Sequence, residues 1–304
     1  MRRICERQNY KAQSATDAKH LNFGVKISQI RNARELVHLR KQTEMRMKME
    51  YGLLGEKLGH SYSKEIHELL ADYTYDLCPV SRDNFDDFMK KHDFKAINVT
   101  IPYKKDVIPY LDSMDDNAAA IGAVNTIVNK NGRLEGHNTD FSGFLYMIEK
   151  HNITIKDQKC LVLGNGGAAK AVIAVLKHLN ASEILLVSRR DTPDTITYKE
   201  CLSHHTDAQV IVNTTPVGMF PNMDASPLDL RPFTNCHAVL DIIYNPLETK
   251  LTAQAGSLGI TAVTGLEMLV AQALYAVEFF LDTTLDKSQI DTIYRKIAAE
   301  KTNC

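Results

Sequence analysis

The sequence lacks the residue patterns of a metal site, of a disulfide-stabilised protein and of a membrane protein. Its six cysteines include no CxxC pair and stand near no matching histidine cluster, so neither a zinc site nor a disulfide framework is expected. The most apolar stretch, 266–281, is interrupted by Glu267, Gln272 and Glu278 and is too short to cross a bilayer of about 30 Å. No apolar segment of the signal-peptide kind follows the first arginines. We therefore expect a cytoplasmic protein with no metal and no membrane span.

The 304 residues, 44% hydrophobic and 24% charged, are enough to bury a large core, and the length favours two domains over one. The formal net charge of −1 conceals an uneven distribution, because residues 1–48 carry 12 Lys and Arg against 4 Asp and Glu. We interpret this segment as a solvated basic extension of unknown role. The alternative is an arm that binds nucleic acid, but its charges are spread out, so no nucleic-acid partner is expected.

Short apolar runs alternate with longer helical patterns from residue 50 onward, which is typical of a mainly parallel sheet covered by helices. The cleanest helical pattern is 266–281, where apolar residues recur at the spacing of one buried stripe. The polar stretch His151–Gln158 separates two blocks of alternating elements and is the expected domain boundary. The predicted strands are 50–54, 96–101, 124–128, 159–163, 183–187, 208–213, 238–243 and 260–263.

A glycine-rich turn between a strand and a helix indicates a dinucleotide site. Gly164, Gly166 and Ala169 fit the pattern G-x-G-x-x-A. The first glycine permits a tight turn, the second lets the backbone approach a pyrophosphate, and a small third residue lets helix and strand pack closely. The start of the helix offers free N–H groups to the phosphates. Such a motif alone also fits an ordinary strand–helix turn, but its setting favours the nucleotide site.

Two arginines follow the next predicted strand, where an NAD enzyme usually carries an acidic residue for the ribose 2′-hydroxyl. The guanidinium groups of Arg189 and Arg190 suit a 2′-phosphate, because their planar fork forms bidentate bonds to phosphate oxygens. NADP(H) is therefore the expected cofactor. Asp191 comes directly afterwards and offers an alternative bond to a ribose hydroxyl, and exposed arginines at a strand end remain a further alternative.

Four polar motifs precede the glycine turn: His-Ser-Tyr-Ser at 60–63, Asn-Val-Thr-Ile-Pro-Tyr-Lys at 98–104, Gly-Ala-Val-Asn-Thr at 122–126 and Asn-Thr-Asp at 138–140. Further motifs lie at 213–219, 241–246 and 265–272. Their order and spacing closely resemble the shikimate dehydrogenase family, and the resemblance runs from about Tyr51 to Leu281.

The resemblance implies a role for each matching residue. Lys104 and Asp140 resemble the catalytic pair, and Ser61 and Ser63 resemble the hydroxyls that hold the substrate carboxylate. The groups that resemble those fixing the ring and its hydroxyls are Thr100, Asn125, Tyr244 and Gln272. The cofactor-binding positions implied are Gly164, Asn165, Gly166, Gly167, Ala168, Ser188, Arg189, Arg190, Thr214, Thr215, Met219 and Gly265.

The chemistry gives an independent reason for a lysine and a carboxylate. Hydride reduction of a ketone leaves negative charge on the carbonyl oxygen, which must receive a proton or a strong donor as the bond forms. An ammonium group supplies both, and a nearby carboxylate orients it. The alternatives are structural: a solvated surface lysine for Lys104, helix caps for Ser61 and Ser63, and a cap for Asp140 at a helix beginning near Phe141.

Four residues depart from the family's usual pattern. Lys57 and Lys64 stand where prolines are usual, so their loop is expected to be less rigid. Lys170 replaces an arginine and Ser188 an asparagine, and both changes touch cofactor binding. The strictness of the preference for NADP over NAD therefore stays open.

Together these features predict a two-domain α/β protein with a cleft between the domains. A substrate-binding domain spans 49–150, a Rossmann-like NADP domain spans 151–265, and helices in 266–304 pack back on the first domain. The resemblance implies NADPH-dependent, reversible reduction of 3-dehydroshikimate to shikimate in aromatic amino-acid biosynthesis, by a monomer or homodimer. The alternatives are a dehydrogenase for quinate or aminoshikimate and, more remotely, a non-catalytic regulator that binds the same ligands.

Overall fold

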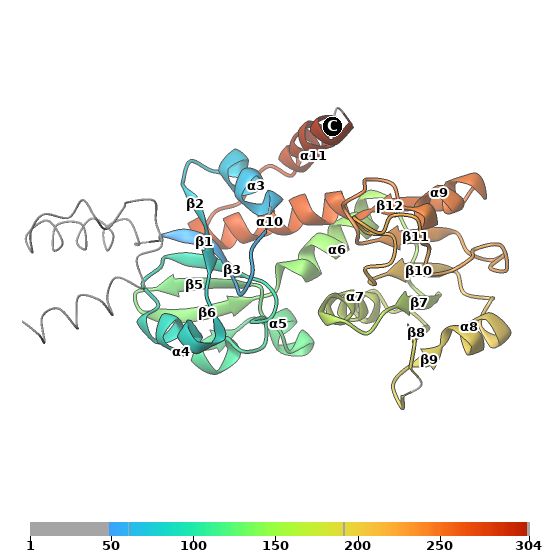
Figure 1. Cartoon of the computed structure of the whole chain (residues 1–304), viewed down its shortest axis with the longest axis horizontal. Coiled ribbons are helices and arrows are strands. Elements are labelled where there is room, and N and C mark those ends of the chain that lie inside the picture. Colours follow the sequence, from blue (N-terminus) through green and yellow to red (C-terminus); the bar gives the residue numbers. More distant parts are fainter. Residues whose placement is uncertain (1–48, 60, 191, 303–304) are drawn as a thin grey trace, which may run out of the picture. The chain divides into compact units, whose positions relative to one another are not determined.

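The structure is a computed structural model that describes residues 49–302 apart from 60 and 191. The basic extension 1–48, His60 and Asp191, which the sequence analysis singled out, lie outside the described residues. The described part contains two six-stranded sheets, each with its own helices (Figure 1). No helix within 49–302 is both long and apolar enough to span a membrane.

The first sheet is mixed, with three parallel and two antiparallel strand pairings. Its strand order is β2-β1-β3-β5-β6-β4, with β1 parallel to both neighbours and β5 antiparallel to β3 and β6. Three of its strands match the predictions within a few residues, and β2, β4 and β6 were missed. The bounds are β1 Tyr51–Gly55, β2 Tyr75–Pro79, β3 Ala96–Val99, β4 Ser113–Met114, β5 Thr126–Lys130 and β6 Arg133–His137.

The second sheet is parallel throughout, with the order β12-β11-β10-β7-β8-β9. The chain enters at the central strand β7, continues to β8 and β9 on one side, and then crosses to β10, β11 and β12 on the other. This is the strand order of a Rossmann fold, and its switch point lies between β7 and β10. The bounds are β7 Lys159–Leu163, β8 Glu183–Ser188, β9 Ile196–Thr197, β10 Val210–Asn213, β11 Ala238–Asp241 and β12 Thr261–Thr264.

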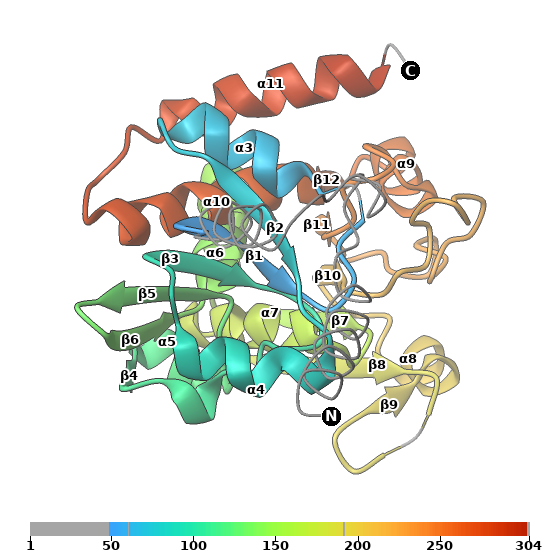
Figure 2. The same cartoon turned by 60° about the vertical axis from the view of Figure 1, so that its left-hand side comes forward.

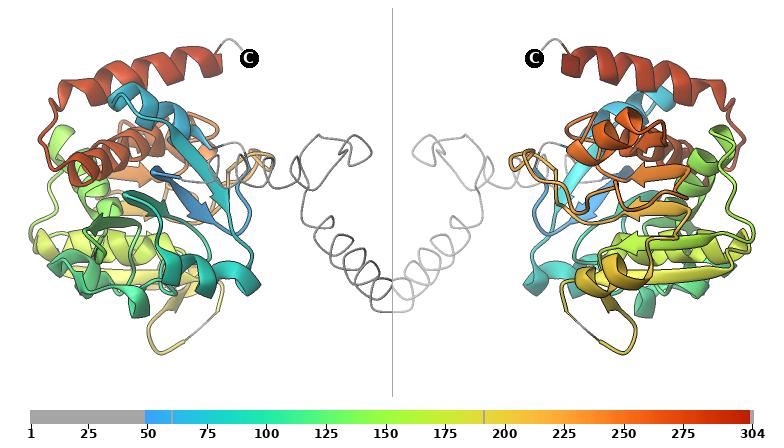
Figure 3. Two further views of the ribbon diagram at one scale, coloured as in Figure 1. Left: turned by 90° about the vertical axis from the view of Figure 1, so that its left-hand side faces the viewer. Right: turned by 90° about the vertical axis from the view of Figure 1, so that its right-hand side faces the viewer.

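Helices cover both faces of this parallel sheet, which explains why its central strands β7, β10 and β11 are nearly continuous apolar runs. Cys160 and Val162 of β7 belong to a hydrophobic cluster with α6 and α7, whereas Leu161 and Leu163 belong to another with α8 and α9. Figure 3, right, shows this part of the chain facing the viewer. The helix bounds are α3 Tyr62–Leu70, α4 Arg82–Lys91, α5 Asp116–Ile121, α6 Thr139–Lys150, α7 Gly167–His178, α8 Tyr198–His204, α9 Lys250–Ser257, α10 Gly265–Leu281 and α11 Ser288–Thr302.

Helix α10 confirms the predicted helix at 266–281, but the prediction that it buries a single stripe was wrong. Buried residues lie on most sides of α10, because it packs against α3, α6, α11 and strands of the first sheet (Figures 1 and 2). A partly buried ion pair connects α10 to α6: Lys150 Nζ lies 2.5 Å from Glu267 Oε1, and the same ammonium contacts Asp291 of α11. Helices α6 and α10 thus form one packed unit that reaches both sheets. The domain boundaries proposed at residues 150 and 265 stay predictions.

Candidate active site

A cavity of about 310 Å³ lies where the carboxyl ends of β1 and β3 meet helices α6 and α10. All of the predicted catalytic and substrate-binding residues line it: Ser61, Ser63, Thr100, Lys104, Asn125, Asp140, Tyr244 and Gln272. Two of the predicted cofactor residues, Ala168 and Gly265, also line it. The cavity therefore gathers side chains from distant parts of the sequence, such as Ser61 and Gln272, which are 211 residues apart.

Parallel pairing of β1 and β3 brings two predicted motifs to one edge of the first sheet. The strands end at Gly55 and Val99, so the segments that follow them emerge side by side. Thr100 extends the pairing, since its backbone N–H donates to the Leu54 carbonyl at 2.8 Å. The next turn is anchored by the buried Tyr103, whose hydroxyl donates to the Val80 carbonyl at 2.6 Å. This anchor fixes the backbone immediately before Lys104.

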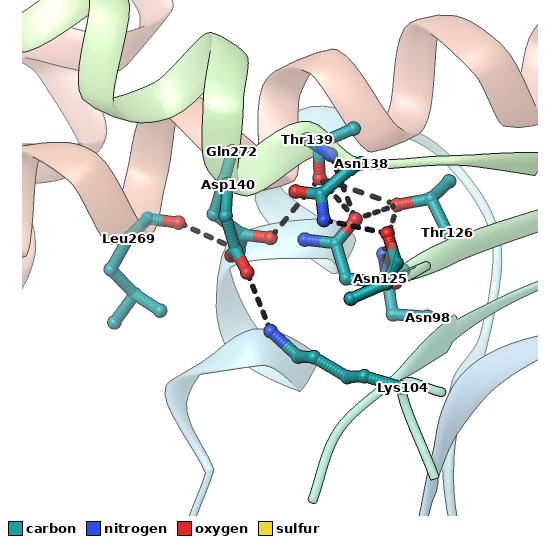
Figure 4. Close-up of polar contacts among 10 residues, drawn as sticks. Asn98, Lys104, Asn125, Thr126, Asn138, Thr139, Asp140, Leu269 and Gln272 are labelled. Atoms are coloured by element: carbon teal, nitrogen blue, oxygen red, sulfur yellow. Dashed lines mark hydrogen bonds and ion pairs between the residues drawn. The ribbon is translucent and has the colours of Figure 1, made fainter. Parts of the chain in front are cut away.

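Lys104 and Asp140 face each other across the cavity, with Lys104 Nζ donating to Asp140 Oδ2 at 2.5 Å (Figure 4). Their side chains are 27% and 18% exposed, so the pair is partly shielded from water but open to a ligand. Asp140 does not cap α6, because Asn138 holds the N-cap position. Asp140 lies in the first turn instead, where the helix dipole favours a carboxylate.

The serines show that a structural role and a site role can coincide. Ser61 is the N-cap of α3, and its hydroxyl oxygen accepts a hydrogen bond from the Ser63 backbone at 3.2 Å. The capping alternative was therefore right for Ser61, whereas Ser63 lies inside the helix. Both residues still line the cavity, where the hydroxyl protons remain able to donate to an anion.

Tyr244 and Gln272 complete the cavity wall from the other side. Burial raises the pKa of Tyr244, which keeps its phenol protonated and able to donate. Gln272, on α10, donates from Nε2 to the Leu269 carbonyl at 2.9 Å, which fixes its amide within the helix (Figure 4).

The glycine turn has the shape that a dinucleotide pyrophosphate requires. Gly164 follows β7 with φ of +99°, a conformation that favours glycine. Its neighbour across the switch point is Thr214, whose backbone N–H and hydroxyl both donate to the Leu163 carbonyl. A Cβ at Gly166 or Gly167 would meet no atom within 4 Å, so the space before α7 is open. With no side chain capping α7, its first N–H groups are available to phosphate.

Four cationic residues belong to the segments next to this turn, two after β8 and two near the start of α7. Arg189 and Arg190 are exposed after β8 and form no ion pair within the described residues. The Ser188 hydroxyl oxygen accepts from the Arg190 backbone at 3.1 Å and thereby shapes this strand end. Near the start of α7, Lys105 lies within hydrogen-bonding reach of Lys170 and lowers the pKa of Lys170. Such a concentration of positive charge fits the phosphates of NADP.

Most of the predicted cofactor residues lie outside the cavity lining. Met219, for example, stands on the loop after β10 and is 42% exposed. Those that the cavity does not gather are Gly164, Asn165, Gly166, Gly167, Ser188, Arg189, Arg190, Thr214, Thr215 and Met219. The roles assigned to them remain predictions.

The cavity also contains residues that the sequence analysis did not assign to it. Asn98 was quoted only as part of a motif and Lys57 only as a departure from the family pattern, yet both line the cavity. Met268 and Leu269 line it as well, and their apolar type made them indistinguishable from core residues of the predicted helix. Only the packing of α10 shows which of its apolar residues reach the cavity.

Comparisons with known proteins agree with the resemblance. A family model described as the shikimate dehydrogenase substrate binding domain matches residues 53–127. The shikimate dehydrogenase (NADP(+)) of Clostridium beijerinckii is 40% identical over 261 residues, which cover 80% of this chain and 96% of that protein.

Solved structures give the same result. A chorismate mutase/shikimate 5-dehydrogenase fusion protein from Clostridium acetobutylicum is 36% identical, with a TM-score of 0.78 over 84% of this chain and 99% of that chain. Shikimate 5-dehydrogenase from Thermus thermophilus, in complex with NADP(H) and shikimate, is 29% identical, with a TM-score of 0.73 over 82% of this chain and 99% of that chain. The motifs, the strand order and these relatives lead to one conclusion: the chain belongs to the shikimate dehydrogenase family.

Proposed function

We propose that this protein is an NADPH-dependent shikimate dehydrogenase, which reversibly reduces 3-dehydroshikimate to shikimate. The observation that carries the proposal is the Lys104–Asp140 contact in a cavity that also collects hydroxyl and amide groups suited to a polyhydroxylated ring acid. The shikimate- and NADP(H)-bound relative from Thermus thermophilus supports the same substrate and cofactor.

In the reductive direction, NADPH would, when bound, supply the hydride that adds to the carbonyl carbon. The ammonium of Lys104 donates to the carbonyl oxygen and passes it a proton as the C=O bond becomes a hydroxyl. Asp140 holds the lysine at 2.5 Å and limits the positions that its flexible side chain can take. In the oxidative direction the substrate hydroxyl gives its proton back to the Lys104 amine.

The remaining residues bind and orient. Ser61 and Ser63 donate to the substrate carboxylate, while Thr100, Asn125, Tyr244 and Gln272 hold the ring and its hydroxyls. The N–H groups at the start of α7 would hold the pyrophosphate, and Arg189 and Arg190 the 2′-phosphate of NADP. We also infer a cytoplasmic monomer or homodimer, in keeping with the free thiols of the four described cysteines.

A spectrophotometric assay tests the proposal with shikimate and quinate, each with NADP and with NAD. Shikimate with NADP is expected to give the highest kcat/KM, and Lys104→Ala and Asp140→Asn to lose most of it. A preference for quinate would place the protein with the quinate-oxidising relatives instead. Lack of turnover with all four pairs, in a protein that still binds shikimate, would favour a non-catalytic regulator.

A further inference from the structure

The side-chain amide of Asn125 is held in one orientation by groups behind the cavity wall. Its carbonyl oxygen, Oδ1, accepts from the backbone N–H of Thr139 at 2.7 Å and from the hydroxyl of Thr126 at 3.0 Å. A backbone N–H can only donate, so the atom facing Thr139 must be the oxygen. The amide nitrogen therefore points the other way, toward the side of Lys104 and Asp140 in Figure 4.

A second amide fixes the direction of the Thr126 hydroxyl. Asn98 Nδ2 lies 3.2 Å from the backbone carbonyl of Asn125, which can only accept, so this atom of Asn98 must be the nitrogen. The same nitrogen donates to Thr126 Oγ1 at 3.0 Å. On its other side, Asn98 Oδ1 accepts from the Tyr75 hydroxyl at 2.7 Å. Thr126 thus receives a hydrogen bond from Asn98 and donates its single proton to Asn125 Oδ1 at 3.0 Å, the nearer of two acceptors, since Thr139 Oγ1 lies 3.2 Å away. The Thr139 hydroxyl also donates to Asn125 Oδ1 at 3.2 Å.

The hydrogen bonds among Asn98, Asn125 and Thr126 are buried, so the loss of any one of them is costly. Tyr75, Thr126 and Thr139 are fully buried, and Asn98 and Asn125 are 6% and 3% exposed. Inside such a low-dielectric region, a polar atom that loses its partner cannot turn to water instead. Asn125 lines the cavity, and its Nδ2 donates to no acceptor among the described residues, so its N–H groups are available to a ligand oxygen.

We propose that Thr126 is a positioning residue, whose hydroxyl joins the Thr139 backbone N–H in holding Asn125 Oδ1 and so keeps the Asn125 N–H groups directed at a substrate oxygen. Thr126 does not line the cavity itself. The inference rests on the proposed function, because the oxygen in question belongs to the hydroxylated ring of the substrate. It adds Thr126 and Asn98 to the residues that determine recognition.

The test is a double-mutant cycle between Thr126→Val and Asn125→Ala. The isosteric Thr126→Val removes the hydroxyl, and kcat/KM for shikimate is expected to fall roughly 10-fold, as for loss of one buried hydrogen bond. The KM for NADP is expected to stay unchanged. Thr126→Ser, which keeps the hydroxyl, is the matched control and is expected to retain near wild-type kcat/KM. In the Asn125→Ala background, Thr126→Val is expected to cause no further loss, because the group that it positions is gone.

Three outcomes would overturn the inference: wild-type kcat/KM in Thr126→Val, an equal loss in Thr126→Ser, or full additivity with Asn125→Ala. Thermal unfolding checks that each variant is folded, and Thr126→Ala is a second hydroxyl-free variant if the valine disturbs packing. A wild type without shikimate turnover rejects the proposed function separately. The positioning is then decided by the Asn125 side-chain amide NMR signals, which should shift in Thr126→Val and not in Thr126→Ser.

Discussion

Lys104 and Asp140 lie 36 residues apart in the chain, and their side chains meet at 2.5 Å inside the cavity. Lys104 lies in the turn after β3, and Asp140 lies in the first turn of α6. Neither residue alone distinguishes this site from an ordinary surface, since solvated lysines and aspartates near helix starts are common. Their contact within a shared cavity, among hydroxyl and amide groups, is what indicates catalysis.

Removal of either member of this pair should slow the reaction without unfolding the protein. We expect Lys104→Ala to lower kcat by roughly 10²- to 10⁴-fold, the usual range for a general acid–base group. Asp140→Asn should cause a smaller loss, because the lysine remains. Steady-state kinetics measure kcat, and titration measures NADP binding. Lys91→Ala, at an exposed position at the end of α4, is the control and should change neither kcat nor NADP binding. Full activity of Lys104→Ala would remove the lysine from the mechanism.

Arg189 and Arg190 should determine the choice of cofactor. Replacing both with alanine is expected to raise the KM for NADP by roughly 10- to 100-fold, since charge-assisted hydrogen bonds to the 2′-phosphate are lost. The KM for NAD should change little, because NAD carries no such phosphate, and it serves as the internal control. Equal increases in the KM for NADP and for NAD would mean that the arginines stabilise the loop and do not bind the 2′-phosphate.

Lys57 should contribute to binding of the substrate carboxylate. It lines the cavity with Ser61 and Ser63 and forms no ion pair within the described part of the chain. Lys57→Ala is expected to raise the KM for shikimate a few-fold at low ionic strength, and by less at about 0.5 M salt, where exposed charges are screened. The matched control is Lys64→Ala, whose ammonium already pairs with Glu68 at 2.6 Å. An increase that is unaffected by salt would argue against a charge effect.

Gly265 should tolerate no side chain, because α10 begins against the backbone of the segment after β11. A Cβ at Gly265 would lie 2.1 Å from the carbonyl oxygen of Ile242. We expect Gly265→Ala to lower the free energy of unfolding by roughly 3 kcal/mol, the cost of severe overpacking. Gly256→Ala in α9, where a Cβ meets no atom within 4 Å, should instead add roughly 0.5–1 kcal/mol. Urea unfolding of the two variants measures the contrast, and equal effects would refute it.

His67 should make the fold sensitive to acid. It is fully buried in α3 beside the Tyr73 hydroxyl and the Tyr75 ring, and burial lowers the pKa of His67 from 6.5 to about 3. Between these pH values the unfolded chain binds a proton at this imidazole and the folded protein does not. The free energy of unfolding should therefore fall as the pH falls from about 6.5 toward 3, by up to about 1.4 kcal/mol per pH unit.

Urea unfolding between pH 4.5 and 7.5 measures this dependence. His67→Gln should flatten it, whatever the variant's stability at neutral pH, because the titrating group is absent. His204→Gln, at an exposed position on α8, should keep the wild-type slope. An unchanged slope in His67→Gln would show that other groups cause the acid sensitivity.

The sequence by itself determined the elements whose local pattern is strong. β7 and β8 were predicted to within one residue, because each contains a continuous apolar run. β7 is buried on both faces of the parallel sheet, whereas Val187 is the one buried residue of β8. The glycine turn followed from G-x-G-x-x-A, and the choice of NADP from two adjacent arginines. The family followed from the order of the polar motifs, which the relatives confirm.

Elements with a weak local pattern were missed. β2 is an edge strand that buries only Tyr75, and β4 and β9 contain two residues each. Such strands form because a neighbouring strand supplies hydrogen-bond partners, and no periodicity in their own residues requires them.

Only the tertiary structure decided which polar groups meet. Thr126 reads in the sequence as a β-branched residue of a strand, and its hydroxyl gains a role only when β3 and β5 pair and bring Asn98 beside it. α10 reads as a one-sided helix and is buried on most sides because α6, α3 and α11 surround it. The reason is physical: periodicity records the face that each residue turns to the core, whereas a site depends on distances between segments that only the packed chain fixes.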